Sequence, residues 1–331
     1  MNNNKLEIVY QNYYEPDKRW EIFDIKSREE YIEKYILPGN FHSLVPDDVK
    51  ASYETAEYLM AHAWYHWPLY DEALKKLTGI FEIAIKQKAA QLNIPLTTTS
   101  KKGKLQSERL HEIINKICEI ENDKGLEHPL LRSKDLRNTF AHPDSNSYMG
   151  GIKTTLDNIM YFINVINHIF LDYILYKNYS AQYKIFEEFK KSVDDELYVL
   201  HYNSKKYIIH DIPHFELFPY RKGYFLFLSV NRVTVNTFQI INDGTITKPL
   251  TLMIDIDGIG QNSLTGTDIL SKTHILIETT DHPDNLVTYS TFISDLNRVE
   301  KEKLNILTIT NNHEAGWGIN RLKYIHLWDK Y

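Results

Sequence analysis

Leu136-Arg137-Asn138-Thr139-Phe140-Ala141-His142-Pro143 lies between two stretches with strong helical periodicity, and the rest of the chain can be interpreted outward from it. An arginine can hold a phosphate through two parallel N–H donors, and a histidine can move a proton near neutral pH. The amide of Asn138 could orient the imidazole of His142. A metal-free phosphodiester cleavage requires these three groups, so Arg137, Asn138 and His142 are candidate catalytic residues.

Long amphipathic helices are predicted on both sides of this stretch. Apolar residues recur at helical spacing over residues 45–68, 68–95, 110–120 and 131–143, and again from about 151 onward. Short breaks between such helices imply antiparallel neighbours in a bundle. Pro143 cannot continue a helix and biases His142 toward extended backbone, so we expect His142 at a helix end.

The chain changes character beyond about Val193, where β-branched and aromatic runs are separated by turn residues. This pattern predicts an antiparallel or mixed sheet. The predicted strands are Leu197–Leu200, Lys206–Ile209, Tyr224–Leu228, Phe238–Ile241, Leu250–Ile254, His274–Ile277 and Leu286–Tyr289. One helix is predicted at about Ser294 to Leu304, before closing strands. Asp255–Gly260 begins like a calcium loop or a glycine-rich phosphate loop, but it lacks the remaining residues of both and is interpreted as a plain loop.

These patterns predict an α+β protein of 331 residues, with an N-terminal helical bundle followed by a β-rich C-terminal domain. The expected division is an N-terminal extension over 1–44, the helical bundle over 45–180 and the β-rich domain, of unknown role, over 193–331.

Composition limits the class of protein further. The one cysteine, Cys118, has no partner in the chain for a disulfide or a cysteine metal cluster, which is typical of a reducing compartment. The N-terminus lacks an apolar signal segment, and the most apolar run, Ile159 to Tyr176, carries Asn, His and Asp residues that a membrane span disfavours. We therefore expect a cytoplasmic protein without a membrane partner.

The net charge of −6 argues mildly against a general nucleic-acid binder, but the charge is unevenly distributed. Between Lys75 and Phe140 there are 13 Lys and Arg against 8 Asp and Glu. Lys101, Lys102 and Lys104 form a cluster in a predicted loop and are candidate RNA-binding residues, whose phosphate contacts would weaken with salt. A solvated, lysine-rich surface explains the same pattern.

One histidine pair has the spacing of a metal site. His62 and His66 are four residues apart on a predicted helix. No third ligand is evident, and the glutamate of a His-Glu-x-x-His site is missing. We therefore interpret them as ordinary bundle histidines and predict neither a metal nor a cofactor.

The combination of about four bundled helices, an Arg-x4-His motif with a polar residue directly after the arginine, and a following long helix resembles the HEPN domain superfamily. Arg137, Asn138 and His142 fall on its motif positions in order, and the resemblance covers roughly residues 45–178. It implies a metal-independent endoribonuclease that acts as a homodimer, with motifs from both protomers lining one cleft. Many relatives are toxins or effectors of antiviral defence and abortive infection, so an antitoxin or a trigger protein could be a partner.

Some relatives are catalytically inactive, which leaves a second function open. The chain would then bind RNA, a nucleotide or a partner protein as an adaptor or sensor. In this alternative Arg137 pairs with Asp135 or another carboxylate, His142 caps the helix end and Asn138 faces solvent. One departure concerns regulation: HEPN toxins silenced by nucleotidyl transfer carry a tyrosine two positions after the histidine, where this chain has Asp144.

A second Arg-x4-His match, Arg321 to His326, shows how little the bare spacing means. This match is predicted to lie in a strand, where positions five apart point to opposite faces, and no asparagine follows its arginine. We therefore interpret it as coincidental.

The geometry of the first match favours a shared site. On an ideal helix Asn138 and His142 share a face, whereas Arg137 and His142 are offset by roughly 140°. Two motifs related by a two-fold axis could line one groove. His142 would act as general base on a ribose 2′-hydroxyl, and Arg137 would stabilise the charge on the phosphoryl oxygens.

Overall fold

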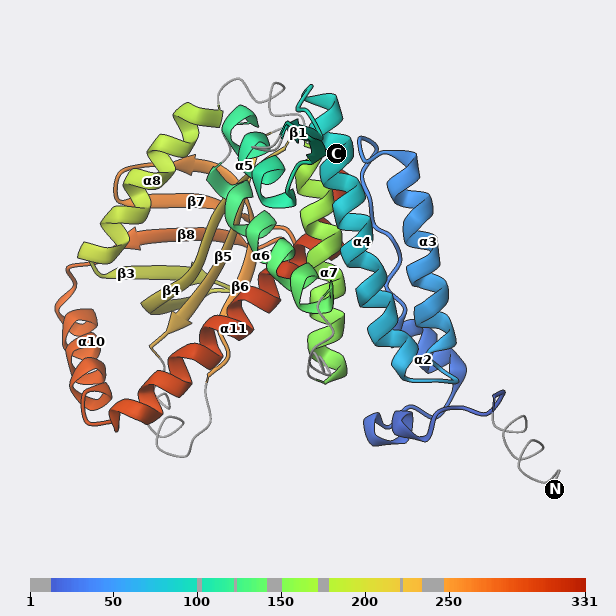
Figure 1. Ribbon diagram of the computed structural model, residues 1–331. Coiled ribbons are helices and arrows are strands. Elements are labelled where there is room, and N and C mark those ends of the chain that lie inside the picture. The colour runs from blue at the N-terminus through green and yellow to red at the C-terminus, as the bar shows by residue number, and fades with distance from the viewer. Residues whose placement is uncertain are drawn as a thin grey trace, which may run out of the picture. The chain divides into compact units, whose positions relative to one another are not determined.

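The computed structural model describes residues 13–99, 103–121, 124–141, 151–171, 179–220, 223–233 and 247–331. The chain divides into two compact units. The first, which we call the helical unit, comprises Met1–Leu171 together with Tyr324–Asp329. The second, the barrel unit, comprises Asp172–Lys323 with Lys330–Tyr331. The first unit is mainly helical and most strands lie in the second, which confirms the predicted α+β class (Figure 1).

The central element of the helical unit is α4, which packs against α3, α5, α6 and α7. Its buried residues Leu74, Leu77, Phe81 and Ile85 recur at helical spacing. The elements of this unit are η1 (Lys18–Phe23), α2 (Arg28–Tyr35), α3 (Asp47–His62), α4 (Pro68–Gln91), β1 (Thr97–Thr99), β2 (Leu105–Ser107), α5 (Leu110–Glu121), α6 (Lys124–Ala141) and α7 (Ile152–Ile169).

The helix that carries Arg137 begins earlier than the sequence predicts. The expected start is near Leu131, after Pro129, whereas α6 starts at Lys124 and contains this proline. A proline inside a helix removes one backbone hydrogen bond. The loss is offset because Leu126 and Leu130, on either side of the proline, are fully buried.

The segment before α3 shares the core of the helical unit. Trp20, Tyr31 and Tyr35 belong to the same hydrophobic cluster as the buried residues of α3 and α4. The ring of Trp20 lies 4.6 Å from that of Tyr31 and 4.3 Å from that of Trp67, measured between centroids. The part treated from the sequence as an extension over 1–44 therefore contributes buried residues to the core of the bundle.

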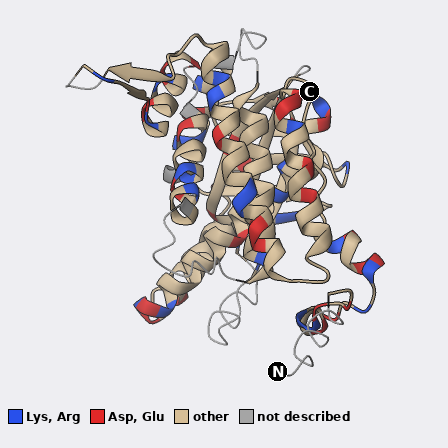
Figure 2. Cartoon of the chain, turned by 45° about the vertical axis from the view of Figure 1, so that its right-hand side comes forward, with Lys and Arg blue, Asp and Glu red and all other residues tan. Residues whose placement is uncertain are grey.

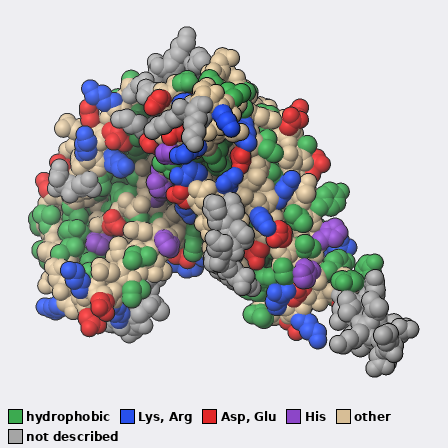
Figure 3. Space-filling view, in the orientation of Figure 1, with side chains coloured by type: hydrophobic (Ala, Val, Ile, Leu, Met, Phe, Trp, Pro, Cys, Tyr) green, Lys and Arg blue, Asp and Glu red, His purple; other side chains and the backbone are tan. Residues whose placement is uncertain are grey.

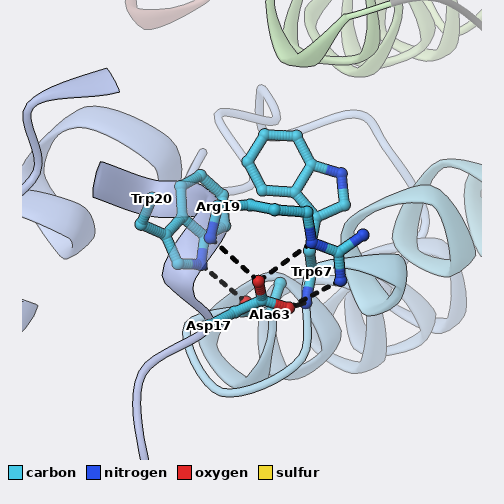
Figure 4. A network of polar contacts seen from close by, with 5 residues as sticks. All are labelled: Asp17, Arg19, Trp20, Ala63 and Trp67. Atoms are coloured by element: carbon cyan, nitrogen blue, oxygen red, sulfur yellow. Dashed lines mark hydrogen bonds and ion pairs between the residues drawn. The ribbon is translucent and has the colours of Figure 1, made fainter. Parts of the chain in front are cut away.

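Asp17 connects this segment by a hydrogen bond to the loop between α3 and α4 (Figure 4). Its carboxylate accepts hydrogen bonds from the guanidinium of Arg19 at 2.6 Å and from the backbone N–H of Trp67 at 2.9 Å. The hydrogen bond from Arg19 outweighs partial burial and, with that from Trp67, lowers the pKa of Asp17 to about 2. Close by, the indole N–H of Trp20 donates to the carbonyl of Ala63 at 3.0 Å.

The predicted long helix after the motif is α7, which is buried on nearly every side. Two of its buried amides, Asn164 and Asn167, are hydrogen-bonded within the helical unit. Oδ1 of Asn164 accepts from the indole N–H of Trp328 at 2.6 Å, and Oδ1 of Asn167 accepts from the backbone N–H of His42 at 2.9 Å. The polar residues within the apolar run Ile159 to Tyr176 therefore contribute internal hydrogen bonds. Asp172, the last polar residue of that run, lies outside the described residues.

The barrel unit begins with α8 (Tyr179–Asp195) and continues with a closed antiparallel barrel. The strands are β3 (Tyr198–Tyr202), β4 (Lys205–Tyr220), β5 (Gly223–Arg232), β6 (Leu250–Ile259), β7 (Ser263–Asp268) and β8 (His274–Thr279). Each strand pairs with the next in sequence, and β8 pairs with β3 to close the sheet. Leu200, Leu226, Leu228 and Ile254 belong to one hydrophobic core, to which α8 adds Phe186.

One predicted strand of the barrel unit is a helix. Leu286–Tyr289 lies within α10 (Pro283–Leu296), so this prediction is wrong. The run Leu-Val-Thr-Tyr favours a strand locally, but the chain just before it is a helix start. Nδ1 of His282 accepts from the backbone N–H of Asp284 at 3.3 Å, and Pro283 occupies the first helical position.

The chain closes with helices, not with the strands that the sequence predicts. The single helix expected at Ser294–Leu304 is instead the boundary between α10 and α11 (Lys301–His326), and η3 (Trp328–Lys330) follows. Asp255–Gly260, interpreted above as a loop, lies almost wholly in β6, and the predicted strand Phe238–Ile241 is outside the described residues. Along the described parts of the chain, no helix has the length and apolar content needed to cross a membrane.

Candidate active site

Arg137 lies on α6 and is held by an ion pair with α4. Its Nη2 is 2.9 Å from Oε2 of Glu82, and the two side chains are 32% and 27% exposed. Lys86, one turn further along α4, contacts the other carboxylate oxygen of Glu82 at 2.7 Å. Burial raises the pKa of Glu82, but the hydrogen bonds from Lys86 and Arg137 outweigh burial and lower this pKa below its usual value. Glu82 is therefore ionised at neutral pH and positions the guanidinium.

Asn138 lies directly beside this guanidinium. Nη1 of Arg137 donates to Oδ1 of Asn138 at 3.3 Å. The third candidate residue, His142, lies outside the described residues, because the structure describes α6 only as far as Ala141. The structure therefore brings the Arg137 and Asn138 side chains together and adds Glu82 to them.

A groove of about 420 Å³ follows one face of α6. Its described lining residues all belong to this helix and recur every three or four positions. They are His128, Leu131, Arg132, Asp135, Leu136 and Thr139. The guanidinium of Arg132 lies over the ring of Tyr161 on α7, 4.4 Å from its centroid, which restrains one wall of the groove. The groove and Arg137 thus share the same helix.

Basic and acidic side chains are interspersed along the helices (Figure 2) and on the face that Figure 3 presents. Of the three predicted RNA-binding lysines, Lys101 and Lys102 lie outside the described residues. Lys104 is exposed in the connection between β1 and β2, which form a short hairpin where the sequence predicts a loop. A hairpin tip can present a lysine to a phosphate as well as a loop can.

The histidine pair considered for a metal lies near the end of α3. Nδ1 of His62 is 2.8 Å from the carbonyl oxygen of Tyr58, one turn earlier in the same helix. His66 follows the end of this helix. Within the ranges that the structure describes, no group of three or more His, Cys, Asp or Glu side chains could hold a metal ion.

The second Arg-x4-His match lies in a helix, so its predicted place in a strand is wrong. Arg321 and His326 both belong to α11, where residues five apart have the same offset of roughly 140° as in the first match on an ideal helix. The two matches differ in the residue after the arginine. Asn138 follows Arg137 and contacts it, whereas Leu322 follows Arg321.

The carboxylate partner of Arg137 is distant in sequence. Asp135 is the nearby candidate that the sequence offers, but it pairs with Lys134 at 3.1 Å. The one sequence signal for Glu82 is its spacing of four from Lys86 on a predicted helix, which is typical of an exposed ion pair. Only the packing of α4 against α6 places it next to Arg137.

Comparison of the chain with protein-family models, with curated proteins and with solved structures finds no match. The resemblance to HEPN domains therefore depends on the motif and its helical surroundings.

Proposed function

We propose that the helical unit is a metal-independent endoribonuclease of the HEPN type, with Arg137, Asn138 and His142 as its catalytic residues. The observation that supports the proposal most directly is the contact between Arg137 and Asn138, with the guanidinium held in place by Glu82. A guanidinium that is already positioned can stabilise the charge that develops on a phosphoryl group without reorganising during the reaction.

In the proposed reaction His142 takes the proton of a ribose 2′-hydroxyl, and the 2′-oxygen forms a bond to the adjacent phosphorus. The bond from phosphorus to the 5′-oxygen of the next nucleotide breaks, and that oxygen receives a proton. The products are a 2′,3′-cyclic phosphate and a 5′-hydroxyl. The contacts of Arg137 with Glu82 and Asn138 use two of its five N–H groups, so three remain for the phosphoryl oxygens. DNA lacks the 2′-hydroxyl and should resist cleavage.

We infer that two copies of the chain complete the site. Because Arg137 and His142 are offset by roughly 140° on an ideal helix, a single motif does not converge on one phosphate. Two α6 helices facing each other across a two-fold axis would supply complementary groups, with RNA bound between them. The groove along α6 lies on the same helix and is the surface that we assign to this pairing. A cytoplasmic toxin or antiviral-defence effector, controlled by an antitoxin or a trigger protein, fits such an enzyme.

One observation favours the alternative of an inactive binding module. The ion pair between Arg137 and Glu82 joins α4 to α6, and a pair of this kind can be purely structural. In that case Glu82 neutralises the charge that a phosphate would need. The unit would then bind RNA, a nucleotide or a partner protein as an adaptor or sensor.

The test is incubation of the full chain with total RNA in EDTA, followed by chemical identification of the new ends. We expect cleavage that leaves 2′,3′-cyclic phosphates and that disappears in Arg137→Ala and His142→Ala. The matched controls are Arg321→Ala, from the second Arg-x4-His match, and His111→Ala, from the exposed face of α5, and both should cleave normally. Undiminished cleavage by Arg137→Ala would contradict the proposal, and RNA binding without cleavage by the folded wild type would select the alternative.

The shared site has a test of its own. Sedimentation velocity should show a dimer, and mixing Arg137→Ala with His142→Ala protein should restore part of the cleavage, because one site of such a mixed dimer can have an intact Arg137 facing an intact His142. A strictly monomeric chain with full activity would rule out the two-copy arrangement.

A further inference from the structure

A separate pocket lies in the barrel unit, between the β4–β5 ladder and the helices α10 and α11. Its volume is about 80 Å³. One wall is apolar and consists of Phe292, Leu296, Leu304 and Leu307 from the two helices. The opposite wall is polar and comes mainly from β4 and β5. A cavity with an apolar wall and a few convergent polar groups is the usual form of a small-molecule site.

A β-bulge places one of the polar residues. Ile209 on β4 pairs with Arg232 on β5, and Asp211 pairs with the adjacent Asn231, so His210 is an extra residue in the ladder. Such a bulge redirects a side chain and is frequent beside functional sites. The ring of His210 packs edge-on against Phe292, 4.7 Å between centroids, which turns it toward the apolar wall of the pocket.

Three side chains of the polar wall are hydrogen-bonded to one another in a row. Nδ2 of Asn311 on α11 donates to Oδ1 of Asn231 at 3.3 Å. Nδ2 of Asn231 in turn donates to Oδ2 of Asp211 at 3.1 Å. These contacts connect β4, β5 and α11, and they engage Asp211, which is the one carboxylate among the described lining residues.

Thr308, also in the lining, donates to the carbonyl of Leu304 at 2.9 Å, but three other polar side chains have no such partner. Nδ1 of His210, Nε of Arg232 and Oγ1 of Thr247 are covered from solvent, and among the described residues none has a hydrogen-bond partner. Arg232 is half-buried, and its described contact is with the face of the Tyr207 ring, 5.0 Å from the centroid. No ion pair joins it to a carboxylate in the described part of the chain. Covered polar groups without partners are costly, so three of them around one small cavity call for an explanation.

We propose that this pocket binds a small oxyanion, the carboxylate or phosphate group of a small molecule, through Arg232, Thr247 and His210. An arginine N–H can only donate, and a hydroxyl and an imidazole nitrogen can each donate as well. One group with several acceptor oxygens therefore satisfies all three, whereas a cation would meet the guanidinium with like charge. Burial lowers the pKa of His210, so its ring is neutral at pH 7 and carries one N–H for this purpose.

The size of the cavity limits the ligand. An apolar cavity of roughly 150 Å³ holds a benzene ring, and this pocket has about half that volume. It admits a phosphate or a carboxylate with a short carbon chain against Phe292 and Leu296, but not a nucleobase. Every described residue of the pocket belongs to the barrel unit, so the site is independent of whether the helical unit cleaves RNA.

The proposal can be tested by isothermal titration calorimetry of the full chain with inorganic phosphate and with acetate. Chloride at equal ionic strength is the reference for each anion. We expect saturable binding of at least one anion, and the anion that binds identifies the head group as phosphate or carboxylate. Arg232→Gln should weaken it by about tenfold. Thr247→Val, which keeps the shape of the side chain, should weaken it several-fold while the protein stays folded. The matched control is Arg298→Gln, because Arg298 is 72% exposed and pairs only with Asp295 among the contacts that the structure describes.

Two results would overturn the proposal. The first is that neither anion binds saturably to the folded wild type. The second is that Thr247→Val and Arg232→Gln bind as tightly as the wild type, or that Arg298→Gln weakens binding equally, because the anion would then be held by general surface charge.

Discussion

Asp17 illustrates how one carboxylate secures the N-terminal segment of the helical unit. Its pKa of about 2 in the folded protein lies below the value near 3.8 of the unfolded chain. It therefore contributes stability that is fully present above about pH 4 and is lost as the pH falls toward 2. The side chain is 13% exposed, and we expect Asp17→Asn to lower the free energy of unfolding by about 1 to 2 kcal/mol at pH 7.

Urea denaturation of the wild type and Asp17→Asn between pH 7 and pH 3 measures this contribution. The difference between them should shrink as the pH falls below about 4. Asp24→Asn is the control, because the side chain of Asp24 is 83% exposed, and it should change the free energy of unfolding by less than about 0.5 kcal/mol. A difference for Asp17→Asn that is constant over the whole pH range would contradict the assigned pKa.

A second prediction about a single residue concerns Glu82, whose carboxylate holds the guanidinium of Arg137 in place. Glu82→Gln removes the charge of the ion pair and should lower the free energy of unfolding by less than about 1 kcal/mol, since both partners are partly exposed. If RNA is cleaved as proposed, the rate should fall about tenfold, because a guanidinium that is no longer held must be ordered during the reaction.

Lys86→Met provides the matched control for this prediction. It removes the other cation bound to Glu82 but leaves the contact between Glu82 and Arg137. Single-turnover cleavage should be close to the wild-type rate in this variant. Equal losses in Lys86→Met and Glu82→Gln would mean that Glu82 acts through general stability and does not position the arginine.

The candidate site could be predicted from the sequence only where its parts are neighbours in the chain. Arg137 and Asn138 are adjacent, so their side-chain contact follows from local geometry. Glu82 lies on a different helix, and no local pattern connects it to the motif. The three unpartnered polar groups of the barrel pocket were missed for the same reason, because they meet through a bulge and strand pairing that the sequence does not reveal.

At the scale of elements, the approach of β7 to β6 requires a glycine. A Cβ on Gly266 would collide with the backbone carbonyl oxygen of Asp255 on β6. The backbone of β6 cannot move away from Gly266 without breaking hydrogen bonds between the two paired strands. We therefore expect Gly266→Ala to lower the free energy of unfolding by about 2 to 3 kcal/mol, measured by urea denaturation.

A second glycine offers a matched control with the opposite sign. Gly316 lies within α11, and a Cβ there would meet no atom within 4 Å. Gly316→Ala should raise the free energy of unfolding by about 0.5 to 1 kcal/mol, because alanine favours a helix interior over glycine. The close approach of β6 and β7 would be refuted if both substitutions stabilised the protein.

Elements were predictable where periodicity is strong and the neighbours are local. The bundle helices α3, α4, α5 and α7 and most of the barrel strands follow their apolar patterns. α11 does not, because its apolar residues are spread around the helix and β-branched residues such as Ile306 and Thr308 favour strands locally. The closure of the barrel also could not be predicted from the sequence, because it depends on pairing between β3 and β8, the first and last strands of the sheet, which are far apart in the chain.

At the scale of the whole molecule, the end of the chain completes the core of its first unit. Tyr324–Asp329 belongs to the helical unit, although the residues before it belong to the barrel unit. The hydroxyl of Tyr324 donates to the carbonyl of Pro38 at 2.8 Å, and Trp328 is 2% exposed. A division of the sequence at residue 180 does not place Tyr324–Asp329 in the helical unit, because no pattern in these residues indicates that they pack against the N-terminal helices.

The helical unit should therefore depend on Trp328. Trp328→Ala leaves a large cavity and should cost about 3 to 5 kcal/mol. Trp328→Phe keeps a ring but removes the N–H from which the buried Oδ1 of Asn164 accepts, at a cost of about 1 to 3 kcal/mol. Ile325→Ala, at a position that is 44% exposed, is the control and should change the free energy of unfolding by less than about 0.5 kcal/mol.

Hydrogen exchange of the full chain shows where the stability is lost. Because Trp328 packs within the helical unit, backbone amides of α3, α4 and α7 should exchange faster in Trp328→Ala, whereas those of β5 and β6 should keep the protection they have in the wild type. Faster exchange confined to the barrel strands would place the C-terminal residues in the other unit. If it is instead confined to the helices, the helical unit cannot reach its full stability without Tyr324–Asp329, which are more than 150 residues away in sequence from the rest of the unit.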